Sequence, residues 1–234
     1  MILAEHDIEN YKKWAKANRE IIAQELTDTS LLDTDDNPVS VFMAGSPGAG
    51  KTESSVQLIK TFHRKILRID TDEYRKYFES MGYNGSNSHI YQGPASLITE
   101  RVHDHALKKR LSFVFDGTFS NYIKALENIE RSLRKGRLVQ ILYVYQEPIL
   151  AWDFTKKREQ VEGRKILKEN FINQFFESRE TVQKIKDKFG ENIKVDVIIK
   201  DIDNSELEYI RNVSVISSHI KEKYSLQELQ NILQ

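Results

Sequence analysis

The chain alternates short apolar runs with longer amphipathic stretches. Five apolar runs rich in β-branched and aromatic residues are typical of buried parallel strands, and they lie at 39–44, 65–70, 112–116, 138–145 and 194–200. Apolar residues recur three and four apart in the stretches between them, which predicts helices at 52–62, 97–111, 122–135, 149–158 and 169–189. This alternation predicts an α/β fold with a parallel sheet of about five strands covered by helices on both faces.

Both ends of the chain differ from this central pattern. Residues 8–32 are predicted to form an amphipathic helical arm, and the polar stretch 33–38 ends in proline and indicates a linker. Residues 206–234 are predicted to be helical, with a capping box from Ser225 to Glu228 at the start of the last helix. We therefore expect an N-terminal arm and linker at 1–37, a core at 38–203 and a C-terminal helical extension at 204–234.

A glycine-rich loop follows the first predicted strand and precedes a predicted helix. The loop and the first helical residues form the expected nucleotide-binding stretch, which is Gly45, Ser46, Pro47, Gly48, Ala49, Gly50, Lys51, Thr52 and Glu53. In such a P-loop the backbone N–H groups bind phosphates, the lysine reaches the β- and γ-phosphates, and the hydroxyl of Thr52 holds Mg²⁺. The glycines have the reverse of the spacing that a dinucleotide-binding loop requires. The sequence therefore predicts a P-loop NTPase fold that binds ATP (or GTP) with Mg²⁺.

Polar residues after the other strands are expected at the same edge of the sheet, because ligands bind beyond the carboxyl ends of the strands in open α/β folds. Asp70 and Asp72 follow the second predicted strand. A carboxylate here can accept the proton of an acceptor hydroxyl during phosphoryl transfer, and we assign this catalytic role to Asp72. Asp70 is expected to be structural or to face the metal, although either acid could instead cap the following helix.

The third predicted strand ends in Asp116, followed by Gly117 and Thr118. The acid could bind Mg²⁺ through water or hold the acceptor. A hydrolytic ATPase more often has Asp-Glu at this position, with the glutamate activating water, so the sequence favours a kinase.

A charged stretch at 156–165 surrounds a glycine and resembles a mobile lid, and this segment is called the lid below. Its Arg158 and Arg164 could stabilise the charge on a transferred phosphoryl group, or they could belong to a solvated helix surface. Tyr83, Asn84 and Gly85 predict a turn that could lie on the acceptor side. His103 and His105 lie two apart on a predicted helix, share no face and are given no role.

Composition narrows the classes of partner. The 234 residues contain 35 lysines and arginines and 35 aspartates and glutamates, so no overall field attracts the chain to nucleic acid or an anionic membrane. There is no cysteine and no apolar stretch of membrane-spanning length, and the first residues do not resemble a signal peptide. We expect a cytoplasmic location and neither nucleic acid nor a membrane as partner.

The ordered set of motifs resembles the zeta toxin family of P-loop kinases over about residues 39–200. The resemblance rests on the P-loop, the Asp-x-Asp pair, the acid-glycine-threonine motif and the Glu-Gly-Arg of the lid. It implies that Asp72 is the catalytic base, that Lys51, Arg158 and Arg164 are catalytic, and that Asp116, Gly117 and Thr118 bind substrate. Members of the family phosphorylate the sugar of UDP-N-acetylglucosamine and are inhibited by an antitoxin.

The expected function is therefore that of an ATP-dependent kinase of a hydroxyl on a nucleotide sugar such as UDP-N-acetylglucosamine, and the resemblance adds the role of toxin in a toxin–antitoxin pair. Thr52 and Asp70 are the expected metal ligands. Two alternatives stay open at this point: a metabolite kinase with another acceptor, and a regulatory nucleotide-binding ATPase.

Overall fold

The structure, a computed structural model, describes residues 2–221 and 223–233. Its α-helices are α1 (Ile2–Leu26), α2 (Lys51–Thr61), α3 (Thr71–Tyr74), α4 (Ser88–Lys108), α5 (Tyr122–Arg134), α6 (Pro148–Glu162), α7 (Lys168–Phe189) and α8 (Leu226–Ile232). Its strands are β1 (Val39–Ala44), β2 (Leu67–Asp70), β3 (Phe113–Asp116), β4 (Leu138–Tyr145), β5 (Lys194–Lys200) and β6 (Glu206–Ile210). Three short 3₁₀ helices are η1 (Arg75–Met81), η2 (Gly190–Asn192) and η3 (Ile216–Ser218).

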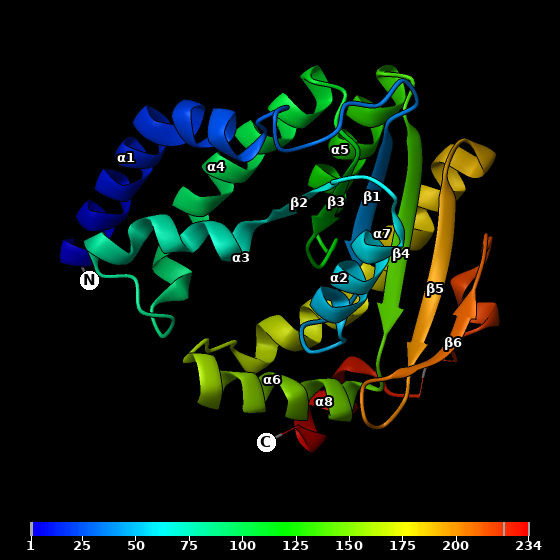
Figure 1. The fold of residues 1–234 in the computed structure, drawn as a ribbon. Coiled ribbons are helices and arrows are strands. Elements are labelled where there is room, and N and C mark those ends of the chain that lie inside the picture. The colour runs from blue at the N-terminus through cyan, green and yellow to red at the C-terminus, as the bar shows by residue number, and fades with distance from the viewer. Residues whose placement is uncertain (1, 222, 234) are drawn as a thin grey trace.

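The strands form one sheet in the order β2-β3-β1-β4-β5-β6. The first five are parallel, as predicted, and β6 adds an antiparallel edge. Strand β1 lies between β3 and β4, so the loop that follows it emerges near the middle of the sheet. In Figure 1 the arrows of β1, β4 and β5 point toward α6, which lies beyond the carboxyl edge.

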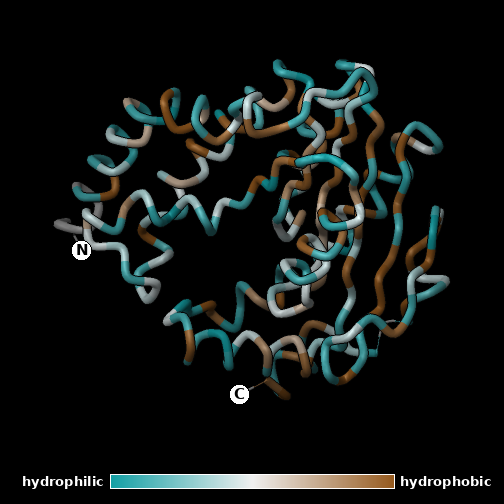
Figure 2. Tube along the Cα trace, viewed as in Figure 1, coloured by the Kyte–Doolittle hydropathy of each residue, from teal (hydrophilic) through white to brown (hydrophobic). Residues whose placement is uncertain are grey.

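Alternate residues of each central strand point to opposite faces of the sheet and pack into two apolar layers. Val41 and Met43 of β1 pack with Leu142 and Val144 of β4 in a cluster that α2 covers. Phe42 belongs to the larger cluster on the opposite face, to which α4, α5 and α7 contribute. Figure 2 shows the brown apolar tubes along the strands and the teal polar positions toward the surface. Burial on both faces explains why these strands are nearly continuous apolar runs.

The predicted N-terminal helix is confirmed, although it ends at Leu26 rather than at residue 32. It packs along α4, which itself begins at Ser88 rather than at residue 97 (Figure 1). The helix α4 continues through Pro94, and the burial of Tyr91 and Ala95 on either side of the proline packs this part of the helix into the core. The arm is therefore part of the packed structure and supports the helix behind β2 and β3.

The prediction that residues 206–234 are entirely helical is wrong at its start, because Glu206–Ile210 forms β6. This short edge strand follows a turn at Asn204, whose φ is +67°, and it pairs with β5 through Ile198 and Tyr209. The Tyr209 hydroxyl also donates to Asp196 Oδ2 at 2.7 Å. Pairing with β5 thus determines the conformation of this mostly exposed segment and overrides the predicted helix.

The predicted capping box of the last helix is confirmed at Ser225 and Glu228. Leu229 and Leu233 of this C-terminal segment pack into an apolar cluster with Trp152 of α6 and Phe171 of α7. The three-part division of the chain stays a prediction, and its residues 1, 222 and 234 lie outside the described part. No described helix has the length and apolarity needed to cross a membrane.

Candidate active site

The loop between β1 and α2 has the strand–loop–helix geometry that phosphate binding requires. Strand β1 ends at Ala44 and α2 begins at Lys51, so the helix N-terminus faces the loop. A β-carbon on Gly48, whose φ is +72°, would lie 2.0 Å from the carbonyl oxygen of Ala151 in α6. Only glycine therefore allows the loop to pack this closely against the helix that leads into the lid.

Lys51 lies in the middle of the site. Its Nζ donates to the Ser46 carbonyl oxygen at 2.6 Å, so the amine is held over the loop that would cradle the phosphates. Burial lowers the pKa of Lys51 to about 8, although the carboxylates of Asp116 and Asp72 favour its charged form. The amine is thus a cation at neutral pH that a phosphate group would stabilise further.

The parallel register of β2 and β3 places Asp70 beside Asp116. Arg68 lies two residues before Asp70, on the same side of the strand, and its Nη2 donates to Asp70 Oδ2 at 2.7 Å and to Asp116 Oδ2 at 2.6 Å. Arg68 also forms an ion pair with Glu73, and Ser55 of α2 donates to Asp116 at 3.1 Å. One guanidinium group therefore holds three carboxylates together.

Asp70 has a perturbed ionisation. Burial raises its pKa to about 6, and the negative charges of Asp72 and Asp116 add to this effect against the opposing charge of Arg68. Its Oδ1 accepts a hydrogen bond from the backbone N–H of Asp72 at 2.8 Å, which caps α3. Asp70 is therefore the helix cap, which was one of the roles that the sequence left open for this pair of acids.

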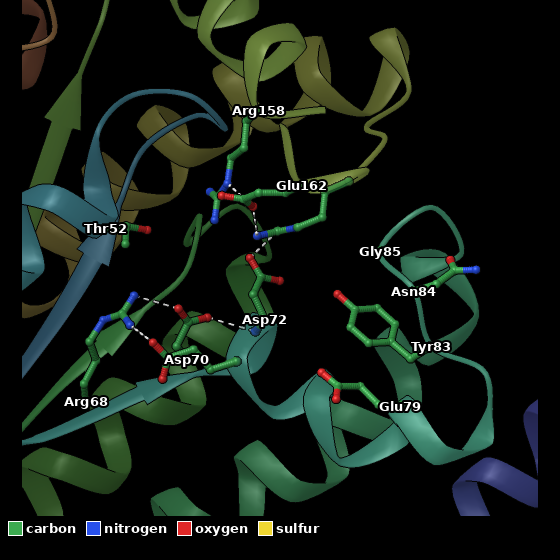
Figure 3. Close-up of a pocket in the computed structure, with 12 residues that line it drawn as sticks. Thr52, Arg68, Asp70, Asp72, Glu79, Tyr83, Asn84, Gly85, Arg158 and Glu162 are labelled. Carbon is green, nitrogen blue, oxygen red and sulfur yellow. Dashed lines mark hydrogen bonds and ion pairs between the residues drawn. The ribbon is translucent and has the colours of Figure 1, made fainter. Parts of the chain in front are cut away.

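Asp72 projects from the first turn of α3 into a cavity of about 550 Å³ (Figure 3). Its Oδ1 pairs with Arg75 at 2.9 Å, and its Oδ2 accepts a hydrogen bond from Arg164 of the lid. Burial favours the neutral acid, but the charges of Arg164 and Arg75 outweigh it and keep the pKa of Asp72 below its ordinary value. Asp72 is thus a carboxylate at neutral pH, with 36% of its side chain exposed, and can accept a proton.

The cavity has two walls, which we call the phosphate side and the acceptor side after the roles predicted from the sequence. The side chain of Thr52 and the lid arginines line the first. Glu79, Tyr83 and Asn84 line the second, and in Figure 3 the Tyr83 hydroxyl points across the cavity toward Asp72. The turn predicted at 83–85 therefore lines this cavity, and its role toward an acceptor stays a prediction.

The lid comprises the last turns of α6 and the first residues of the connection to α7. Arg158 lies on α6, where its Nε donates to Glu162 Oε2 at 2.7 Å, and Arg164 follows Gly163, which ends the helix. Both arginines line the cavity with Asp72, so the structure brings together residues up to 92 positions apart in the chain.

The Zeta toxin family model matches residues 22–214 of the chain. The chain belongs to the zeta toxin family. Its P-loop fold and its helical ends agree with this assignment, and the chain is a phosphotransferase with a hydroxyl acceptor. No curated protein sequence matches the chain significantly.

Solved structures share the fold of the chain at low sequence identity. One comes from the PezAT chromosomal toxin–antitoxin system of Streptococcus pneumoniae, with a TM-score of 0.63 and 18% identity over 97% of this chain and 87% of that one. Another is the native AvrRxo1-ORF1:-ORF2 complex, with a TM-score of 0.60 and 14% identity over 97% of this chain and 78% of that one. The same complex with ATP also has a TM-score of 0.60, with 14% identity over 96% of this chain and 72% of that one.

The other predicted site residues are not among the residues that line the cavity, and their roles stay predictions. The Thr118 carbonyl oxygen accepts a hydrogen bond from Gly45 N at 3.1 Å, which joins the acid-glycine-threonine motif to the P-loop. Asp116 is directed toward Arg68 and Ser55. Glu53 is exposed on the first turn of α2.

The two histidines that were given no role are accounted for by packing. His103 is buried with its ring edge-on to Phe113 and Phe115, and burial lowers its pKa to about 3. His105 lies 3.1 Å from Glu20 of α1. Among the described residues no group of three or more acids and histidines is arranged to hold a metal ion.

No role in this site was assigned from the sequence to Arg68, Glu73, Arg75, Glu79 or Glu162, although Glu162 belongs to the lid motif. A signal existed for Arg68, because its spacing of two from Asp70 on a strand places both side chains on one face. Arg75 lies three residues after Asp72, at helical spacing, and is buried beside it. The pairing of β2 with β3, which brings Arg68 to Asp116, could not be identified from the local pattern.

Proposed function

We propose that the chain is an ATP-dependent, Mg²⁺-requiring kinase that phosphorylates a hydroxyl of a nucleotide sugar such as UDP-N-acetylglucosamine, and that it is the toxin of a toxin–antitoxin pair. The observation that carries this proposal is the position of Asp72, an ionised carboxylate between the P-loop, two lid arginines and a separate acceptor-side wall. A hydrolase needs room for water alone, whereas this cavity has a polar wall beyond the base. The toxin role is supported by family membership and by the similarity to the PezAT structure.

Phosphoryl transfer needs positive charge around the γ-phosphate and an oriented nucleophile. Lys51 faces the loop that would bind the phosphates, while Arg158 and Arg164 approach from the lid. Asp72 would orient the acceptor hydroxyl and accept its proton. Asp116, Gly117 and Thr118 would help to hold the acceptor, beside the start of the P-loop.

The oxygen groups at the phosphate side suit Mg²⁺. The Thr52 hydroxyl lines the cavity and has no hydrogen bond within the described part of the chain, and Asp70 lines the same cavity. A hydroxyl, a carboxylate, phosphate oxygens and water are the ligands that Mg²⁺ prefers, so Thr52 and Asp70 would hold it. When bound, the ion would neutralise charge on the transferred phosphoryl group.

The acceptor is tested by incubating the protein with ATP, Mg²⁺ and UDP-N-acetylglucosamine and detecting the phosphorylated sugar nucleotide by mass spectrometry. Asp72→Asn should abolish transfer but retain ATP binding, because the amide cannot accept the proton. Glu73→Gln is the matched control, since it removes one negative charge from the adjacent residue. If the wild-type protein hydrolyses ATP at the same rate with and without the sugar nucleotide and forms no product, the proposed acceptor is wrong.

The toxin role is tested separately in cells. Expression of the wild-type chain should arrest growth and deplete UDP-N-acetylglucosamine, whereas Lys51→Ala should do neither at the same protein level. Normal growth with accumulation of a phosphorylated metabolite would support a non-toxic kinase instead.

A further inference from the structure

The acceptor-side turn and the lid touch through their backbones. We name residues 82–87 the acceptor loop. A β-carbon added to Gly85, whose φ is +86°, would lie 2.5 Å from the carbonyl oxygen of Glu162 in the lid. A β-carbon on Gly163, whose φ is +72°, would lie 3.7 Å from backbone atoms of the acceptor loop. The contact therefore depends on the missing side chain of Gly85 far more than on that of Gly163.

The acceptor loop is held by its own hydrogen bonds. Asn87 Nδ2 donates to the Gly82 carbonyl oxygen at 2.9 Å, and its Oδ1 accepts from the Asn84 backbone N–H at 3.1 Å. The ring of Tyr83 packs edge-on against that of Tyr91 in α4, with centroids 5.6 Å apart. The loop is thus attached to the core and provides a fixed surface for the lid.

The contact lies next to the lid arginines. Arg164 directly follows Gly163 and pairs with Asp72, while Glu162 accepts from Arg158 at 2.7 Å. The position of the backbone at residues 162–163 therefore determines the positions of the guanidinium groups of Arg158 and Arg164. Figure 3 shows Glu162 and Arg158 above the cavity and Gly85 beside it, next to Asn84 and Tyr83 of the acceptor loop.

We propose that Gly85 is a positioning residue for the lid: the acceptor loop forms the surface on which the lid closes, and this contact aligns Arg158 and Arg164 with the phosphoryl group. Because Tyr83 and Asn84 of the same loop line the acceptor side, an acceptor seated there would hold the loop and the lid together. Transfer to the acceptor is then favoured over transfer to water. The coupling to the acceptor rests on the proposed kinase function, but the contact itself can be tested without it.

The first test measures lid position in the absence of any acceptor. The chain has no cysteine, so Ser80→Cys on η1 and Val161→Cys in the lid, both exposed, accept spin labels without a background signal. Gly85→Ala should lengthen and broaden the distance distribution between the labels. Gly136→Ala, in the turn between α5 and β4, is the matched control, because Gly136 has a comparable left-handed φ of +65° and no atom within 4 Å of an added β-carbon. Its distance distribution should match that of the protein in which no glycine is substituted.

The second test measures coupling with ATP and UDP-N-acetylglucosamine. Gly85→Ala should reduce phosphotransfer about 100-fold, the order expected when catalytic groups are misplaced by about 1 Å, while ATP affinity changes little. Its ratio of ATP hydrolysis to transfer should rise, and that of the control Gly136→Ala should stay at the wild-type value. A structural defect alone would lower both activities together.

A further variant covers the case in which Gly85→Ala does not fold. Asn87→Ala removes the hydrogen bonds that hold the acceptor loop without substituting any lid residue, so it should broaden the same distribution of distances between the spin labels. Distances that stay unchanged in both folded variants would overturn the proposal. If the wild type does not phosphorylate the sugar nucleotide, the proposed acceptor fails, whereas the spin-label distances still decide the role of Gly85.

Discussion

Asp70 should make the protein less stable at neutral pH than it is in mild acid. The perturbation that isolates this effect is Asp70→Asn. The amide keeps the shape of the side chain and an oxygen that can still accept from the Asp72 N–H, now at 2.8 Å, so the cap of α3 is retained. Arg68 keeps its two other partners, Asp116 and Glu73. The substitution therefore removes mainly the buried charge.

The magnitude follows from the pKa of Asp70, which burial raises from its ordinary value of 3.8 to about 6. A difference of about two units corresponds to about 3 kcal/mol, because each unit is worth about 1.4 kcal/mol. The folded state binds this proton more tightly than the unfolded state. The resulting stability is fully present below pH 3.8 and is lost as the pH rises through about 6.

Urea unfolding of both proteins between pH 4 and pH 7.5 measures this difference. The free energy of unfolding of Asp70→Asn, relative to the wild type, should rise by about 3 kcal/mol from pH 4 to pH 7. Asp203→Asn is the control of opposite sign, because hydrogen bonds from Ser205 lower the pKa of Asp203. Wild-type and Asp70→Asn curves that run parallel across this range would refute the reasoning.

Three further perturbations have expected outcomes. Since Lys51 loses its proton above about pH 8, the ATP affinity of the wild type should fall about tenfold per pH unit between pH 8 and 10. The ATP affinity of Lys51→Arg should not change over this range, and equal slopes for the two proteins in calorimetric titrations would contradict the prediction. Leu229→Ala in α8, at a fully buried position, should cost about 2–5 kcal/mol of unfolding free energy. The exposed Leu226→Ala should cost less than about 0.5 kcal/mol. Similar losses in the two variants would show that α8 does not stabilise the packing of α6 and α7. Arg68→Met should destabilise the protein by about 3–5 kcal/mol at pH 7 and by less at pH 5, where Asp70 binds a proton; an equal loss at both pH values argues against charge repulsion.

The sequence predicted the parts of the fold that local periodicity determines. All five parallel strands, the P-loop and the acid pair after β2 were found, because each depends on residues close together in the chain. The edge strand β6 was missed, since its alternation of polar and apolar residues covers only four exposed positions and the pairing with β5 stabilises it. The end of α1 and the start of α4 differed from the prediction by several residues.

The site was less predictable because it depends on contacts between distant segments. That Asp70 and Asp116 lie side by side follows from strand order and register, and neither is encoded in a local pattern. The approach of Gly85 to the lid is likewise a tertiary contact across 77 residues, from 85 to 162. A glycine in a turn is expected for conformational reasons alone, so the sequence could not identify its second role.

The cations of the site differ in how firmly they are held, and this difference indicates which of them would move toward a phosphate. Arg68 is fixed by three carboxylates. Lys51 is held by a single carbonyl oxygen, and Arg158 by one half-exposed glutamate. Arg164 is bound to Asp72 itself, so its transfer to an incoming phosphoryl group would leave Asp72 paired with Arg75 alone. Weakening the contact with Arg164, the largest of the charges that lower the pKa of Asp72, strengthens Asp72 as a base. We therefore expect the base to gain strength when the phosphoryl donor arrives, which is the moment at which the acceptor hydroxyl must lose its proton.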